Sequence, residues 1–83
     1  MHYQRTKPSN KVITIITSAE PVTVSIIGSG SQSYLLANGY KQASRLDEEL
    51  KRQGYSCTLN FAGGLGWFVR IENEDLSKIR KVV

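Results

Sequence analysis

The sequence predicts an α+β domain in which a small antiparallel or mixed β-sheet of four to five strands has one main helix packed on a face, with a short helix at the C-terminus. Three observations predict this class: alternating β-branched segments in the first third, one amphipathic helix in the middle, and a second pair of alternating segments around a glycine-rich stretch. The expected order is β-β-(β)-α-β-β-α. A chain of 83 residues holds one core. We therefore assign residues 1–11 to a flexible basic arm and residues 12–83 to a single domain.

The first predicted unit is a β-hairpin. Its strands are KVITIITS and PVTVSIIG, both rich in β-branched residues, and the short connector around Pro21 favours antiparallel pairing. In the second strand, Val22, Val24 and Ile26 alternate with Thr23 and Ser25. This period of two places one face on a core and leaves the other in water.

The stretch SYLLANGY, residues 33–40, allows two interpretations. It could be a third strand that ends at Asn38-Gly39, or the first turns of a helix with Ser33 as the N-cap. An Asn-Gly pair inside a helix is costly, so a short strand followed by a helix is favoured. The helix is expected over residues 41–53, with Gly54 just after its end. Its apolar stripe is Ala43, Leu46 and Leu50.

A second hairpin is predicted from YSCTLNF (55–61) and WFVRIE (67–72), with AGGLG as its loop. Alternation places Trp67, Val69 and Ile71 on the core face, and Phe68, Arg70 and Glu72 on the opposite face. Residues 73–83 are expected to form the C-terminal helix, because Asn73 suits an N-cap and the apolar residues follow helical spacing. Those apolar residues are Leu76, Ile79 and Val83.

The charge distribution is basic. The formal net charge is +4. Before Asp47 there is one acidic residue, Glu20, and there are five basic residues. The C-terminal segment adds Lys78, Arg80 and Lys81. Such an excess suits contact with nucleic acid, a ribonucleoprotein or an acidic protein surface, and it equally suits plain solubilising charge.

The sequence lacks a set of residues that could form a catalytic site, so we expect no enzymatic activity. His2, the one histidine, lies in the predicted arm, and the single cysteine, Cys57, alternates with core residues. The acids at 47–49 point in different directions around a helix, and the glycines of GGLG lie between two strands, not before a helix. We therefore expect no cofactor and no metal. One cysteine, no long apolar run and no signal-peptide pattern favour a cytoplasmic protein without membrane contact.

Two segments resemble parts of known families. GLGWFVRI resembles the RNP1 stretch of RNA-recognition motifs, which implies base stacking on an exposed Phe68 beside Arg70. ASRLDEELKRQGYSCTL followed by WFVRI is similar to the helix-then-strand core of SPOR-type peptidoglycan-binding domains. Each resemblance covers a minor part of the chain, and the leading hairpin departs from both patterns.

Two functional hypotheses follow. The first is a small non-enzymatic regulator or inhibitor of the kind encoded by phages and mobile elements, anti-CRISPR proteins among them, which engages a host protein or ribonucleoprotein complex by its basic sheet surface and blocks nucleic-acid binding. The alternative is a domain that binds nucleic acid directly through Phe68, Arg70 and the basic arm. A homodimer is compatible with both. The candidate partner-binding residues are Arg5, Lys7, Lys11, Lys41, Arg45, Phe68 and Arg70.

Overall fold

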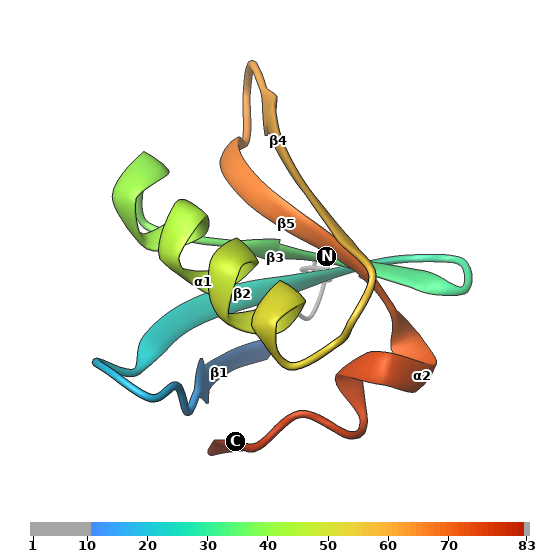
Figure 1. Ribbon diagram of the computed structural model, residues 1–83. Helices are drawn as coiled ribbons and strands as arrows, with labels where there is room; N and C mark the ends of the chain where they lie inside the picture. The colour runs from blue at the N-terminus through green and yellow to red at the C-terminus, as the bar shows by residue number, and fades with distance from the viewer. Residues whose placement is uncertain (1–10, 83) are drawn as a thin grey trace, which may run out of the picture.

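A computed structural model describes residues 11–82, and the predicted arm with Arg5 and Lys7 falls almost wholly outside this range. The described chain is an α+β fold in which the strands form one sheet and a helix lies across it (Figure 1). In chain order the elements are β1 (Lys11–Ile15), β2 (Val22–Ser29), β3 (Gln32–Leu36), α1 (Tyr40–Arg52), β4 (Cys57–Ala62), β5 (Gly66–Glu72), α2 (Asn73–Leu76) and β6 (Lys81–Val82).

The sheet has six strands in the order β4-β5-β3-β2-β1-β6, and all its strand pairs are antiparallel. Both predicted hairpins are confirmed, as β1–β2 and β4–β5. The ambiguous stretch is a strand, so the first three strands form a meander that ends before Gly39. The pairing of β3 with β5 joins this meander to the second hairpin at the centre of the sheet.

Helix α1 covers one face of the sheet. Its stripe is confirmed, since Ala43, Leu46 and Leu50 are fully buried. They pack in one cluster with inward side chains of the strands, and α1 lies over β4 and β5. The predicted alternation of the strands therefore builds the single core. Its sheet side consists of Ile13, Ile15, Val22, Val24, Leu35, Val69 and Ile71.

The strand count and the C-terminal segment differ from the sequence prediction. The sheet has six strands instead of four to five, and the helix expected over 73–83 ends at Leu76. The i,i+3 spacing of Leu76 and Ile79 suits a tight turn as well as a helix, and Ile79 is buried at 4% exposure. The chain then reaches the free side of β1, where the Ile16 N–H donates to the Arg80 C=O at 3.0 Å and β6 pairs with β1.

Asn73 has a different role from the predicted N-cap. The N-cap position belongs to Glu72, and no side chain caps the helix. The Asn73 side chain instead holds the β2–β3 turn: its Nδ2 donates to the Gly30 C=O at 3.0 Å, and its Oδ1 accepts from the Ser33 hydroxyl. These bonds tie α2 to the meander.

Candidate interaction surface: the open face of the sheet

The face of the sheet opposite α1 has no helix on it within residues 11–82 (Figure 1). Both α1 and α2 place their buried side chains in the core on the other side. We call the side of the sheet without a helix the open face. On the half of this face formed by β4, β5 and β3, the strand register sets six side chains side by side: Tyr34, Leu36, Thr58, Asn60, Phe68 and Arg70.

Two aromatic rings stack on the open face. Tyr34 and Phe68 come from the neighbouring strands β3 and β5, and their ring centroids are 4.8 Å apart with an interplanar angle of 19°. Alternation places Phe68 on the correct face, but its side chain is only 8% exposed. The hypothesis of base stacking requires an exposed Phe68 ring. The ring is buried and is therefore not free to stack on a base. Tyr34 is half-buried and is the more accessible of the two rings.

Sequence reasoning did not single out Tyr34. Its position lies in the stretch that could be strand or helix, so its face could not be assigned. Once β3 is known to pair with β5, Tyr34 lies directly opposite Arg70. An aromatic side chain and an arginine on the same face are the signal that could have identified it.

Among the predicted binding residues within 11–82, Arg70 is the basic residue that lies on this half of the open face. It is half-buried between Tyr34 on β3 and Thr58 on β4, and no carboxylate within residues 11–82 forms a salt bridge with it. The neighbouring Glu72 carboxylate instead accepts a hydrogen bond from Gln32 Nε2 at 2.9 Å. With respect to residues 11–82, the guanidinium therefore has donors available for an external acceptor.

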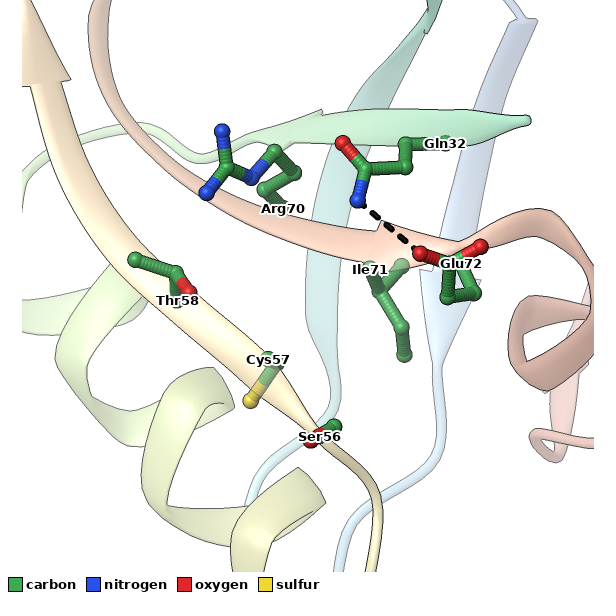
Figure 2. Close-up of a pocket in the computed structure, with 7 residues that line it drawn as sticks. All are labelled: Gln32, Ser56, Cys57, Thr58, Arg70, Ile71 and Glu72. Atoms are coloured by element: carbon green, nitrogen blue, oxygen red, sulfur yellow. Dashed lines mark hydrogen bonds between the residues drawn. The ribbon is translucent and has the colours of Figure 1, made fainter. Parts of the chain in front are cut away.

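A hollow opens beside Arg70, at the end of the sheet where β4 begins (Figure 2). On its open-face side it is lined by Gln32, Thr58, Arg70 and Glu72. Gln32 Nε2 donates to the Glu72 carboxylate, so the Arg70 guanidinium and the Thr58 hydroxyl are the donors that suit a carboxylate, a phosphate or a backbone carbonyl of a partner. The remaining lining residues are Ser56, Cys57 and Ile71.

The other predicted basic residues do not converge on the open face. Lys41 and Arg45 lie on α1, across the sheet from Arg70, and Arg45 Nη1 pairs with the Glu20 carboxylate at 2.9 Å. Lys11 is at the start of β1, and its parity is that of the inward residue Ile13. The structure thus distributes the described basic residues over two sides of the sheet.

The surroundings of Cys57 disfavour the thiolate, the nucleophilic form of the side chain. Burial, followed by a hydrogen bond to the Asp47 carboxylate and its negative charge, raises the pKa of the Cys57 thiol to about 12. The thiol Sγ donates to Asp47 Oδ1 at 3.2 Å, and the other carboxylate oxygen accepts from Lys51 Nζ at 3.1 Å. At neutral pH the group is therefore a thiol, whereas nucleophilic catalysis requires a thiolate.

In residues 11–82, side chains of histidine, cysteine, aspartate and glutamate form no cluster of three or more that could hold a metal ion. The same part of the chain contains no helix long and apolar enough to cross a membrane. No protein-family model, curated protein or solved structure matches the chain in comparisons with all three. The case for a function therefore depends on the geometry of the open face.

Proposed function

We propose that this chain is a non-enzymatic binding protein that contacts a larger protein or ribonucleoprotein assembly through the open face of its sheet. The observation that carries the proposal is the position of Arg70, a half-buried cation with no salt bridge in the described chain, beside the Tyr34 ring on a face without a covering helix. Arginine and tyrosine are enriched among residues that dominate binding energy at interfaces. The regulator or inhibitor role, in the style of anti-CRISPR proteins, stays a prediction.

The mechanism follows from the composition of the face. Thr58 and Asn60 offer polar contacts around the aromatic pair, and Arg70 offers charged hydrogen bonds to an acidic group. A partner surface that normally receives nucleic acid would be basic, so blocking it through Arg70 would require contact at an acidic site beside that surface. When the chain occupies this site, it would sterically exclude nucleic acid from the neighbouring surface.

Charge reversal at Arg70 tests the proposal. The tagged chain is used to capture partners from lysate of its source cells, with and without nuclease, as wild type, Arg70→Glu and Arg80→Glu. Arg80 is exposed and lies beside β1, toward the edge of the sheet opposite to β4, so its variant carries the same change of charge far from the Tyr34 and Arg70 side chains. We expect Arg70→Glu to reduce recovery of a nuclease-resistant partner about tenfold, equal to roughly 1.4 kcal/mol, and Arg80→Glu to preserve it. Equal recovery by both variants would exclude the open face.

Direct binding of nucleic acid is a second candidate, favoured by the Tyr34 ring next to Arg70 on neighbouring strands. Stacking of a base on Tyr34 would be worth about 1–3 kcal/mol, so Tyr34→Ala should weaken binding of single strands by that amount. Phe68→Ala is a poorer test, because removal of a buried ring also destabilises the fold. Capture that disappears after nuclease treatment would favour this candidate over a protein partner.

A further inference from the structure

Strand β4 forms one edge of the sheet, and within residues 11–82 no strand pairs with its outer side. The Trp67 C=O on β5 accepts from the Ala37 N–H at 3.1 Å, so the backbone of Trp67 faces β3. Because the direction alternates along a strand, Val69 and Ile71 also face β3, and the residues between them face β4. Their β4 counterparts across the ladder, Cys57, Leu59 and Phe61, must therefore direct their N–H and C=O groups away from the sheet.

A local hydrogen bond supports this assignment. The Phe61 N–H donates to the side-chain Oδ1 of its own neighbour Asn60 at 3.0 Å, as expected of a backbone amide with no strand partner. The outer edge of β4 thus presents the backbone N–H and C=O groups of Cys57, Leu59 and Phe61, with which no strand of residues 11–82 pairs.

The usual protection of an edge strand is absent from β4. Its sequence, CTLNFA, contains no charged residue and no proline. The opposite edge of the sheet is β6, which has two residues, one of them Lys81. Of the two edges, β4 is therefore the long and uncharged one.

Exposed apolar side chains gather beside this edge. Phe61 is 55% exposed and Leu65, in the hairpin loop, is 46% exposed. Tyr40 at the start of α1 is 53% exposed, and its ring and that of Phe61 contact Trp67, with centroid distances of 4.8 and 5.1 Å. This apolar surface next to unpaired backbone is where a further strand would bury the most area.

We propose that two copies of the chain pair through their β4 edges, antiparallel about a twofold axis at Leu59, and so form one continuous sheet. In this register Leu59 lies opposite Leu59 of the second copy, and Cys57 lies opposite Phe61. Every outward N–H and C=O of these residues then has a partner. On the helix side of the sheet, each new cross-strand pair joins two apolar side chains. On the open face, Thr58 of one copy lies opposite Asn60 of the other.

The helices are compatible with this arrangement. Helix α1 runs along β4, since Tyr40 and Phe61 both contact Trp67 at one end and the Cys57 thiol donates to Asp47 at the other, and it covers both β4 and β5. Adjacent strands are about 4.8 Å apart, so a helix centred between β4 and β5 would lie about 10 Å from its copy. This is close to the 8–10 Å at which helices pack.

Opposite pairs of charges at Thr58 and Asn60 test the register. Thr58→Glu/Asn60→Glu places glutamates opposite one another in the dimer, whereas Thr58→Glu/Asn60→Lys places glutamate opposite lysine. Both sites are exposed, and both variants carry the same Thr58→Glu change next to Arg70, so the two proteins differ at one exposed residue. Sedimentation velocity over a range of concentrations measures the dimer dissociation constant, and circular dichroism checks that both variants fold.

We expect dimers for the wild type and for the glutamate–lysine variant, and a dissociation constant at least about tenfold higher for the glutamate–glutamate variant, because two cross-strand pairs change from attraction to repulsion. Equal dissociation constants for the two variants would overturn the proposal. A wild type that stays monomeric at every concentration would also overturn it. The partner-capture experiment with Arg70→Glu concerns a different surface, so either proposal can fail alone.

Discussion

At the scale of single residues, the pair of Cys57 and Asp47 links the helix to the edge strand. The thiol pKa is raised, so the folded chain keeps this proton at pH values where the unfolded chain loses it. The resulting stability is complete below the ordinary thiol pKa and is lost progressively as the pH rises toward about 12. The free energy of unfolding therefore falls in alkali, because the folded surroundings of Cys57 oppose its ionisation.

Alkylation of Cys57 should be slow in the native protein. At pH 8 the thiolate fraction falls about a thousandfold when the pKa rises by three units, and the higher intrinsic reactivity of the more basic thiolate recovers only part of this. We expect iodoacetamide to react at least about tenfold more slowly with the folded chain than with the urea-unfolded chain. Asp47→Asn removes the negative charge and should accelerate the reaction in the folded state. An unchanged rate in that variant would contradict the role of Asp47.

Glu49 shows the opposite balance. Burial opposes its ionisation, but hydrogen bonds from Gln53 and Ser18 and the charge of Arg52 outweigh burial and hold the pKa of this carboxyl below its ordinary value. Its contribution to stability is present above the ordinary carboxyl pKa and is lost as the pH falls through the lowered value. In the sequence, Glu49 is one of three adjacent acids on a helix. Its burial and hydrogen bond with Ser18 could not be predicted, because Ser18 lies in a turn far away in the sequence.

At the scale of elements, the end of α1 follows local sequence rules. The Tyr55 N–H donates to the Leu50 C=O and the Gly54 N–H to the Lys51 C=O, each at 3.0 Å, which is the Schellman pattern of hydrogen bonds. Gly54 has a φ of 96°, a backbone conformation that favours glycine. Its position after the helical stripe made this helix end predictable.

Gly54→Ala should therefore destabilise the protein. No heavy atom lies near the added methyl group, so the cost comes from backbone conformation and should be about 1–2 kcal/mol. Gly63→Ala is the matched control, since Gly63 also has open space around it and lacks a positive φ. Urea unfolding followed by circular dichroism measures both. A loss at Gly63 as large as that at Gly54 would refute the conformational explanation.

The last element shows where local rules fail. Leu76 and Ile79 were correctly expected to be buried, but their spacing does not distinguish a helix from a turn followed by a strand. The deciding contacts are the bond between Ile16 and Arg80 and the donation by Lys81 Nζ to the Leu76 and Ile79 carbonyls. The first of these joins residues far apart in the sequence, which a periodic pattern cannot reveal.

At the scale of the whole molecule, the same limit applies to the strand order. Alternation predicted the inward and outward residues of each hairpin, and with them the face of Phe68. It could not show that β3 pairs with β5, nor that the Tyr34 ring stacks on Phe68. The fold class was therefore largely predictable from local patterns, whereas the composition of the open face depends on long-range pairing.

Leu35 lies where the two halves of the sheet meet, with Ile26 on one side and Val69 on the other, and it is fully buried. Leu35→Ala should lower the free energy of unfolding by about 2–5 kcal/mol, a large part of the 5–15 kcal/mol typical of domains. Val12→Ala on β1 is a control at a site that is 58% exposed, and it should change stability by about 0.5 kcal/mol or less. Chemical denaturation measures both, and similar losses would contradict a core centred on β3.

The strand order also determines when the sheet can be completed. β1, β2 and β3 are consecutive in the chain and can pair as soon as residue 36 has been made, but the neighbour of β3 at the sheet centre is β5, which is made only after α1 and β4. Until residue 72 emerges, β3 is an unpaired edge that carries Tyr34 and Leu36. Long-range closure of this kind slows folding and exposes strand edges to aggregation. A nascent chain that stops between residues 40 and 65 would therefore be the form most in need of a chaperone.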